Sequence, residues 1–304
     1  MDPFSTPGRW LRGNLHCHSD RSDGALPPAE VCRRYAAQGY DFLALTDHFV
    51  GRFGYPITDT LPFRSGDFTT LLGAELHSGA MVNGELWHIL AVGLPPDFAP
   101  SQSPDFRPVP GQESGAALAA RARAAGAFVA IAHPHWSGLT EADAAAIEAA
   151  HAVEVYNHGC AVEADRGEGF AQAEHLLNAG RRLTLIATDD AHFHIDDHFG
   201  GWVMVKAAAN APAAILAALK AGAFYSTQGP EIRALSREGD ALQVETSPAA
   251  SVIVAGQGTP TVWRSAEAGT VWTLPLDRLA ASPWLRVTVT DAAGRRAWSN
   301  PLWR

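Results

Sequence analysis

Short runs of hydrophobic residues alternate with amphipathic segments along the first two thirds of the chain. The runs have the length of buried strands, and they predict strands at 10–15, 42–46, 71–76, 86–92, 128–132, 153–156, 183–187 and 202–205. Apolar residues at helical spacing predict helices at about 28–38, 113–125, 141–150, 167–179 and 212–221. Repeated strand–helix–strand units favour an α/β fold with a mostly parallel sheet, and this number of units indicates a barrel.

The pattern changes near residue 231. Segments at 241–246, 251–254, 270–274 and 284–290 alternate in polarity without intervening helices. We therefore expect one α/β domain at 1–231 and a small antiparallel β domain at 232–304. The alternative is that these strands pack on the barrel as additions to it. The proline-rich stretch 94–112 predicts a long surface loop.

Composition restricts the partners. The 304 residues are 47% hydrophobic and carry a net charge of −9, with no basic block. We expect a small-molecule substrate and no extended nucleic-acid surface. No apolar run reaches the roughly 18 residues of a membrane span, and residues 1–13 lack the apolar stretch of a secretory signal. Three cysteines (Cys17, Cys32 and Cys160) without a CxxC pair favour the cytoplasm. The sequence does not indicate an oligomeric state.

Metal-ligand chemistry begins in the segment LHCHSDRSDG at 15–24. His16 and His18 are two residues apart on a predicted strand, so both imidazoles face one side and can hold one ion. Asp23 follows in a glycine-containing loop that can return a carboxylate to the same place.

Further candidate ligands follow at the ends of the predicted strands. They occur in the segments TDH, GAELH, WHIL, AHPH and TDDAH, and they are His48, Glu75, His77, His88, His133, Asp190 and His192. Strand ends of an α/β barrel meet on one rim, so these side chains are expected to converge. Glu75 is the single central carboxylate and the natural bridge between ions.

The ordered set HxHxxxSDG, TDH, a strand-end Glu, HIL, AHP and DAH resembles the PHP (polymerase and histidinol phosphatase) family of metal-dependent hydrolases. The resemblance implies a distorted seven-stranded (β/α) barrel and two or three divalent ions (Mn, Zn or Fe). The implied ligands are His16, His18, Asp23, His48, Glu75, His88, His133, Asp190 and His192, with His77 as the rival of His88. The segments at 224–231 and 297–301 resemble the carbaryl-hydrolase-like branch, which carries a C-terminal β region.

The expected activity is phosphoester hydrolysis of a small phosphorylated metabolite or nucleotide, through a hydroxide that bridges two ions. Glu75, Asp190 and His192 are the expected catalytic residues, and Arg21, His135 and Asn157 the expected substrate contacts. The alternative is a carboxylic or carbamic ester hydrolase that uses the same ions.

Two other classes fit less well. An amidohydrolase barrel often bridges its ions with a carboxylated lysine, but the two lysines, Lys206 and Lys220, follow the last predicted ligand. A non-catalytic metal-binding domain would be expected to lack some of the family's metal ligands. All nine implied positions carry a histidine, aspartate or glutamate, which disfavours this class.

Several residues beside the ligands fit a supporting role. Glu154, Tyr156 and Asn157 end a predicted strand, where they would orient a ligand or serve only strand packing. Asp47 and Asp189 each precede a ligand and would accept a hydrogen bond from a histidine or lie in a loop. His135, His194 and His198 would donate a proton to a leaving group or lie in exposed loops.

Overall fold

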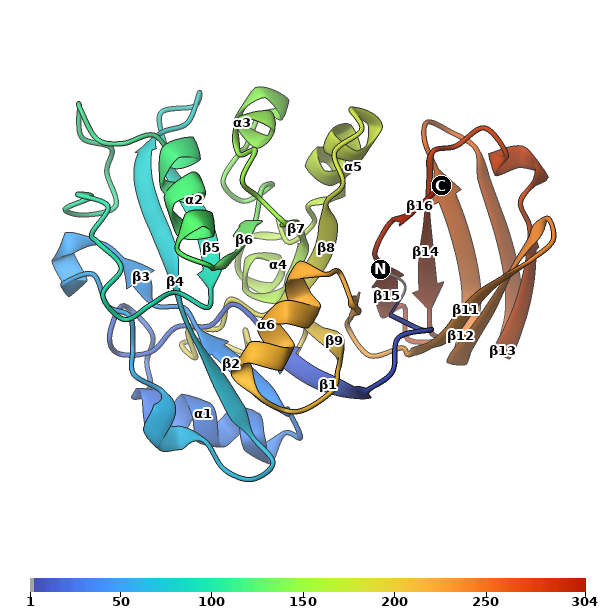
Figure 1. Ribbon diagram of the computed structural model, residues 1–304, viewed down its shortest axis with the longest axis horizontal. Helices are drawn as coiled ribbons and strands as arrows, with labels where there is room; N and C mark the ends of the chain where they lie inside the picture. Colours follow the sequence, from blue (N-terminus) through green and yellow to red (C-terminus); the bar gives the residue numbers. More distant parts are fainter. Residues whose placement is uncertain (1–2) are drawn as a thin grey trace.

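The computed structural model describes residues 3–304, in which strands and helices alternate up to β10 (Figure 1). The strands of this part are β1 (Arg9–Asn14), β2 (Phe42–Leu45), β3 (His48–Phe49), β4 (Thr69–Ala80), β5 (Leu86–Val92), β6 (Phe128–Ile131), β7 (Ala152–Asn157), β8 (Thr184–Thr188), β9 (Trp202–Ala207) and β10 (Phe224–Thr227). The helices are α1 (Pro28–Ala37), α2 (Gly115–Ala124), α3 (Glu141–Ala146), α4 (His158–Ala164), α5 (Phe170–Asn178) and α6 (Pro212–Lys220), with 3-10 turns η1 (Gly51–Phe53) and η2 (Leu61–Phe63).

Local sequence accounts for several helix starts. Pro28 and Pro212 occupy the first turns of α1 and α6, where a missing N–H costs nothing. Ser114 accepts a hydrogen bond from the Ala117 N–H at the start of α2. Thr140 and Asp143 form a capping box at α3. The longest described helices have 10 residues, about half the length of a bilayer span, and no membrane-spanning helix is found among residues 3–304.

The sheet is mixed, and this corrects the expectation of a mostly parallel one. Strands pair in the order β10-β9-β1-β2-β4-β5-β6-β7-β8. The pairs β1–β2, β2–β4, β6–β7 and β7–β8 are parallel, whereas β9–β10, β1–β9, β4–β5 and β5–β6 are antiparallel. The connection from β4 to β5 spans only residues 81–85, too few for the crossover that a parallel pair needs.

Side chains from both ends of the sheet belong to one hydrophobic cluster, which shows that the sheet curves strongly. Leu11 of β1, Leu90 of β5, Ile186 of β8 and Phe224 of β10 all belong to this cluster, and Leu219 of α6 packs with them. Strand β8 also packs against β9 and β10, although no described backbone ladder joins it to them. A second cluster lies between other faces of these strands and helices α2, α3 and α5.

The C-terminal strands continue the same hydrogen-bonded sheet through the antiparallel pair β10–β15. They are β11 (Ile232–Glu238), β12 (Ala241–Gly256), β13 (Thr261–Pro275), β14 (Trp284–Thr290), β15 (Arg296–Ser299) and β16 (Leu302–Trp303), with the 3-10 turn η3 (Asp277–Leu279). Figure 1 shows them at one end of the molecule, where both chain ends also lie. Their hydrophobic cluster includes Tyr225 of β10, and Trp10 of β1 packs against it.

Candidate metal centre

Backbone hydrogen bonds bring the end of β1 against the end of β8. Asp190 N–H donates to His16 O at 2.9 Å, and His18 N–H donates to Ala191 O at 2.9 Å. Cys17 and Ala191 form an isolated parallel bridge between the same segments. Because His16 and His18 face one side while Cys17 faces a buried cluster beside α1, both imidazoles turn toward Asp190.

The neighbouring strands bring a second group to the same place. His48 of β3 is the cross-strand partner of Glu75 on β4, and His77 of β4 is the partner of His88 on β5. Glu75 and His77 are two residues apart and share a face of β4. Partners directly opposite each other also share a face, so His48 and His88 join that group.

Asp47 organises the loop that carries Asp23. Its carboxylate accepts hydrogen bonds from Ser19 N–H at 2.7 Å, from the Ser22 hydroxyl at 2.9 Å and from the Thr58 hydroxyl at 2.6 Å. Gly24 closes the loop, and a Cβ there would lie 2.8 Å from the backbone carbon of His18. The SDG sequence thus fits a tight turn that returns Asp23 to the histidines.

Glu75 lies at the centre of the group and is fully buried. Its Oε1 is 2.7 Å from His88 Nδ1 and 3.0 Å from His133 Nε2. Its Oε2 faces four other rings: His48 Nδ1 at 2.7 Å, His16 Nε2 at 3.5 Å, His18 Nε2 at 3.6 Å and His77 Nε2 at 3.8 Å. The two oxygens therefore face different sets of histidines.

Two further carboxylates extend the group. Asp190 Oδ1 is 2.9 Å from His18 Nε2 and 3.2 Å from His16 Nε2. Asp23 is 3.4 Å from His48 Nε2 and 3.5 Å from His192 Nε2. The His18 ring lies between those of His48 and His192, with its centroid 4.2 Å from each.

These side chains have the chemistry and spacing of ligands for divalent ions. Imidazole nitrogens and carboxylate oxygens that share an ion at about 2.0–2.2 Å lie about 3 Å from one another. Four groups have donor atoms within 4.8 Å of each other: His16/His18/Glu75/Asp190, Glu75/His88/His133, His18/Asp23/His48/His192 and His48/Glu75/His77. His16 Nε2 is buried and has no hydrogen-bond partner, although it faces the group. An ion beside it would satisfy this nitrogen.

Charge is balanced inside the group. Burial raises the pKa of Glu75, but His48, His88 and His16 outweigh it and hold the pKa well below its ordinary value. Burial alone would lower the pKa of His48, yet the charges of Glu75 and Asp23 raise it to about 10. Burial, reinforced by His48 and His192, lowers the pKa of His18 to about 4. The buried carboxylates are thus ionised and need positive charge beside them, which divalent ions also supply.

Glu154, on β7, supports the ligands from behind. Its carboxylate accepts hydrogen bonds from His16 Nδ1 at 3.0 Å, from the His133 backbone N–H at 2.6 Å and from the Thr188 hydroxyl. The Asn157 amide donates to Glu154 at 2.9 Å and to Asp190 at 3.0 Å. Glu154 therefore fixes the His16 tautomer with its Nε2 free for an ion.

Asp189 anchors the segment that carries Asp190. Its buried carboxylate accepts hydrogen bonds from the Tyr35 hydroxyl at 2.7 Å and from the Gly200 and Gly201 N–H groups at 2.8 and 2.9 Å. Asp47 and Asp189 thus hold loops in place. Neither carboxylate accepts a histidine N–H among the described hydrogen bonds.

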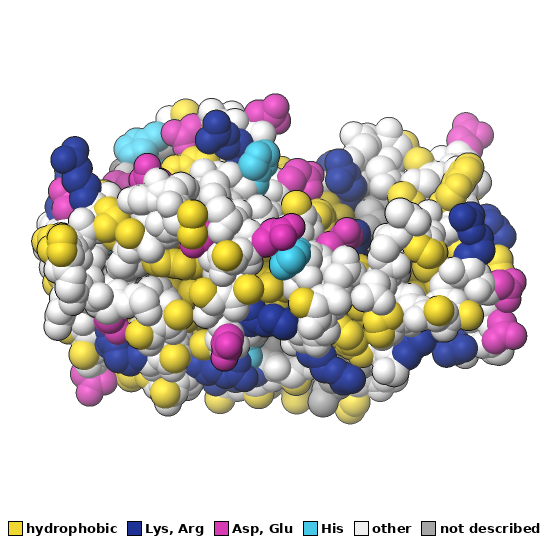
Figure 2. All heavy atoms as spheres, turned by 90° about the horizontal axis from the view of Figure 1, so that it is seen from above, with side chains coloured by type: hydrophobic (Ala, Val, Ile, Leu, Met, Phe, Trp, Pro, Cys, Tyr) yellow, Lys and Arg dark blue, Asp and Glu magenta, His cyan; other side chains and the backbone are white. Residues whose placement is uncertain are grey.

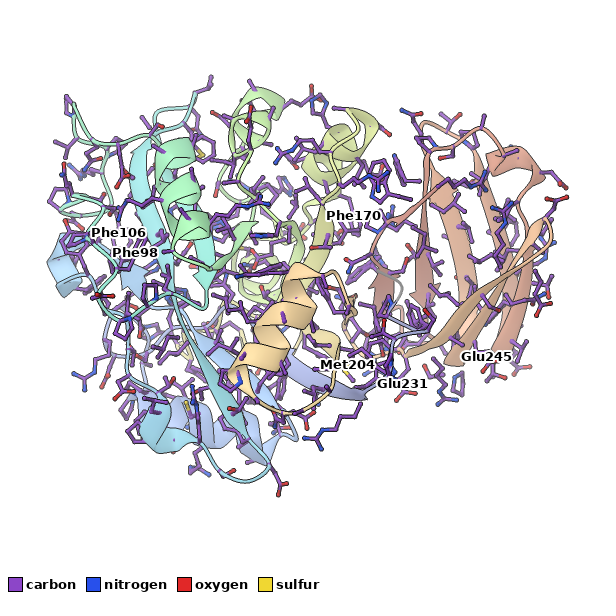
Figure 3. The ribbon with its side chains drawn as sticks, viewed as in Figure 1. Phe98, Phe106, Phe170, Met204, Glu231 and Glu245 are labelled. Atoms are coloured by element: carbon purple, nitrogen blue, oxygen red, sulfur yellow. The ribbon has the colours of Figure 1, made fainter. Side chains whose placement is uncertain are left out.

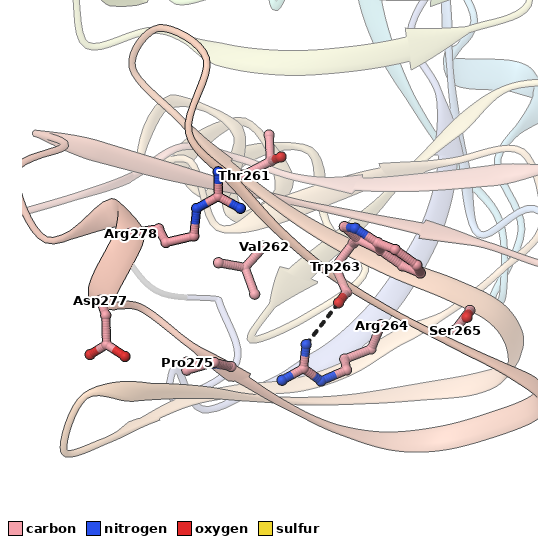
Figure 4. Close-up of a pocket in the computed structure, with 8 residues that line it drawn as sticks. All are labelled: Thr261, Val262, Trp263, Arg264, Ser265, Pro275, Asp277 and Arg278. Atoms are coloured by element: carbon pink, nitrogen blue, oxygen red, sulfur yellow. Dashed lines mark hydrogen bonds between the residues drawn. The ribbon is translucent and has the colours of Figure 1, made fainter.

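A cavity of about 920 Å³ opens over the ligands. Its floor includes Asp23, His48, His88, His133, Asp190 and His192, and its walls include Met81, Phe106, Trp136, Arg166 and His194. Figure 3 shows Phe106 at the end of the molecule away from the C-terminal strands. A second hollow, of about 550 Å³, lies between the start of β13 and residues 275–278 (Figure 4). None of the four described ligand groups lies in that hollow.

All nine predicted ligands belong to these four groups. The three predicted substrate contacts lie elsewhere. Arg21 and His135 are exposed, and neither belongs to the described lining of the cavity. Asn157 is buried and bonded to Glu154 and Asp190, a placement that favours a positioning role over substrate contact. Arg166 lines the cavity in place of Arg21.

Sequence reasoning missed that His77 and His88 both reach the group. The His77 ring is fully buried, and its Nδ1 donates to Trp87 O at 3.2 Å, so its Nε2 presents a lone pair. That nitrogen is 2.9 Å from His48 Nδ1. The cross-strand pairing of His77 with His88 was the missing signal, and it depends on the register of the β4–β5 hairpin.

A comparison with solved structures finds a protein of similar fold. A crystal structure of a two-domain protein from Bacteroides vulgatus, which contains a predicted PHP-like metal-dependent phosphoesterase, matches with a TM-score of 0.54 at 18% identity. The match covers 93% of this chain and 91% of that one. At this identity the likeness shows the fold, and it confirms at that level the resemblance to PHP-like proteins.

More distant or shorter matches were also found. An amidohydrolase from Chromobacterium violaceum has a TM-score of 0.41 at 19% identity over 59% of this chain and 87% of its own. A protein assigned as a metal-dependent phosphoesterase in Bifidobacterium adolescentis has a TM-score of 0.44 at 17% identity over 61% and 89%. A stretch of 35 residues, 12% of this chain, is 57% identical to 13% of a 5'-3' exoribonuclease of Haemophilus influenzae. No family model matches the chain.

Proposed function

We propose that this chain, which shares its fold with a PHP-like metal-dependent phosphoesterase, is a metal-dependent hydrolase that cleaves phosphoesters of a small metabolite or nucleotide. The observation that carries the proposal is the buried group of histidines and carboxylates around Glu75 beneath a cavity of about 920 Å³. A cavity of this size accommodates a small molecule.

The four ligand groups support a site for two or three divalent ions. His16, His18, Glu75 and Asp190 would hold one ion, and Glu75, His88 and His133 a second. Asp23, His48 and His192, together with His18, would hold a third. Mn, Zn and Fe all suit such nitrogen and oxygen ligands. When bound, these ions supply Lewis acidity and lower the pKa of water toward neutrality.

The protein's own side chains have distinct tasks in this proposal. Glu75 would contribute to two ion positions, because its two oxygens face different histidines. Asp190 and His192 would complete the ligand set at the cavity floor, which is open to a substrate. Arg166 lies at the cavity wall, where its guanidinium would contact an anionic group of the substrate.

Hydrolysis of a carboxylic or carbamic ester is the second candidate, and the composition of the cavity wall favours it. Arg166 is the one Arg or Lys in the described lining, whereas phosphate sites commonly use several cations. The same ligands would serve either ester, because the ions act on a carbonyl as on a phosphoryl oxygen.

The proposal extends to the organisation of the chain. We propose a distorted seven-stranded barrel within 1–231 and a small β domain at 232–304. Three buried, unpaired thiols support a cytoplasmic location. The face in Figure 2 intersperses Lys and Arg with Asp and Glu, which supports a small-molecule substrate over an extended nucleic acid.

Metal loading followed by a hydrolysis screen tests the function. Protein reloaded with Mn, Zn or Fe should bind two or three equivalents by elemental analysis, because ten ligand side chains exceed the four to six of one ion. Phosphomonoesters, nucleotides and aryl esters are then compared as substrates. At most one equivalent of metal after reloading would contradict the multinuclear site. Cleavage of aryl esters alone would select the second candidate.

A further inference from the structure

The cavity above the ligands has two unlike walls. On the side of the β4–β5 hairpin the lining includes Met81, Leu86, Phe106 and Trp136. On the side of α4 and the segment after β8 it includes Glu163, Arg166, His194 and Asp197. Two polar residues in the turn of the hairpin, Asn83 and Glu85, also line the first side, and Ile195 also lines the second. A substrate therefore meets mainly apolar side chains on the first side and mainly charged ones on the second.

The two aromatic rings of the apolar wall stand directly beside ligand histidines. The Phe106 ring centroid is 4.9 Å from that of His48 and 5.6 Å from that of His77. The Trp136 centroid is 4.9 Å from that of His133 and 5.5 Å from that of His88. A group attached to the bond that is cleaved would therefore meet these rings first.

Trp136 is fixed in place and yet open to the cavity. The residue is 39% exposed, although its ring lies beside two histidines. The following backbone is held by the Ser137 N–H to His133 O at 3.1 Å and by the Asn83 amide to Ser137 O at 2.8 Å. Val82, in the turn of the β4–β5 hairpin, is 73% exposed and stands in the chain between the lining residues Met81 and Asn83. Exposed apolar side chains gathered at a cavity mark a place where an apolar ligand group binds.

We propose that the substrate carries an aromatic or similarly planar apolar group next to its scissile ester, and that this group packs on Phe106 and Trp136. The inference rests on the proposed function, since it names the substrate class of the same site. The hydroxyl groups of a polyol such as a sugar would lose their hydrogen bonds to water on packing against these rings, and the rings offer no replacement. A planar ring instead buries its faces against aromatic side chains.

Binding of matched non-hydrolysable probes to the metal-loaded protein tests the inference by calorimetry. Benzylphosphonate is compared with ethylphosphonate, and phenylacetate with propionate, so that each pair differs only in the apolar group. We expect the aromatic member to bind about tenfold or more tightly in at least one pair. Trp136→Ala and Phe106→Ala should each remove most of that preference while metal content stays unchanged.

Trp263→Ala is the matched control. Trp263 is 61% exposed, lies on β13 and lines the second hollow, so its loss should leave the preference intact. Equal affinity within both pairs, no binding of either pair, or a preference that survives both wall substitutions would overturn the inference. Aromatic preference in the carboxylate pair alone, with no phosphonate binding, would support the inference and remove the phosphoester proposal.

Discussion

Asp190 has a backbone φ of +58°, in the left-handed region that residues with a side chain seldom adopt. His133, which approaches Asp190 Oδ2 at 4.0 Å, has a φ of +21°. Such strained conformations persist where surrounding contacts hold them in place. Asp190 is held by the hydrogen bond from its backbone N–H to His16 O and by the hydrogen bond that its carboxylate accepts from the Asn157 amide. The strain places the Asp190 carboxylate among the ligands.

Replacement of Asp190 by Asn or of His192 by Ala should remove at least one ion and lower turnover more than about 100-fold. Both side chains belong to ligand groups at the cavity floor. Elemental analysis and steady-state kinetics measure the two effects. His151→Ala is the control, because this histidine directly precedes β7 and its Nδ1 accepts a hydrogen bond from the Val129 N–H, away from the ligand groups. Equal losses in the control would show that the wrong histidines have been assigned.

Glu154→Gln should weaken metal binding by about 10- to 100-fold. Each Glu154 oxygen accepts hydrogen bonds from two donors. The NH2 group of a glutamine would therefore face two donors at either position, and it would displace either the His16 ring or the His133 backbone N–H. Titration with Zn or Co gives the affinity. Glu163→Gln makes the same chemical change at an exposed carboxylate on the cavity wall, and it should leave the affinity unchanged. An unaltered affinity in Glu154→Gln would assign Glu154 to strand packing alone.

Protonation of His151 should lower the free energy of unfolding as the solution becomes acidic. Burial, with Arg123 and Lys220 nearby, lowers its pKa to about 4, against about 6.5 in an unfolded chain. Between these values the unfolded chain binds more protons, so this contribution is present above pH 6.5 and is lost toward pH 4. Urea unfolding at pH 5 and pH 7 should show a smaller difference for His151→Asn than for the native chain. An identical difference would rule out a contribution from His151.

The residue scale also shows where sequence reasoning ends. Spacing within one segment indicated the ligands, because HxH and SDG each describe a local geometry. The role of His77 depends on which residue of β5 lies opposite it, and that register is not encoded in either strand alone. Arg21 was expected at the site because it lies between two ligands in the chain, yet it does not belong to the described lining of the cavity.

At the scale of elements, the sequence predicted most strands and helices but not all of their directions. Buried apolar runs look alike in parallel and antiparallel strands, so β4–β5 and β5–β6 were not recognised as antiparallel. Helix α4 also escaped prediction, because His158–Ala164 is short and has no clear apolar stripe. It matters for the site, since Cys160 and Glu163 of this helix line the cavity.

Side chains rather than a backbone ladder join β8 to β9 and β10, and this gives a prediction for Ser226. Its hydroxyl donates to Leu185 O at 2.8 Å and accepts from the Ala187 N–H at 3.0 Å. Ser226→Ala leaves both buried groups unpaired, which should lower the free energy of unfolding by about 1–3 kcal/mol. Urea denaturation measures the loss. Ser265→Ala, at an exposed position of β13, should change stability by less than about 0.5 kcal/mol. Equal effects would mean that Ser226 does not bridge the strands.

At the scale of the whole molecule, contacts cross the predicted boundary at 231. Trp298 packs on Tyr156 and Phe170, and Trp284 belongs to the same cluster as the residues beneath α5. The Asn300 side chain accepts from the Leu185 N–H at 2.8 Å and donates to Phe224 O at 2.8 Å. The C-terminal strands thus cover the edge of β8 in addition to forming a sheet of their own.

Deletion of 232–304 should therefore destabilise the remaining chain. The shortened protein loses the β10–β15 pairs and exposes the apolar surfaces that Trp284 and Trp298 cover, so we expect a lower melting temperature and aggregation. Thermal unfolding and size-exclusion chromatography of 1–231 against the full chain measure this. Trp298→Ala in the full chain should lower the melting temperature in the same direction, since it removes one buried tryptophan while the sheet remains. A shortened chain that melts with the full one, stays monodisperse and retains its metal would show that the proposed domain 1–231 is stable without residues 232–304.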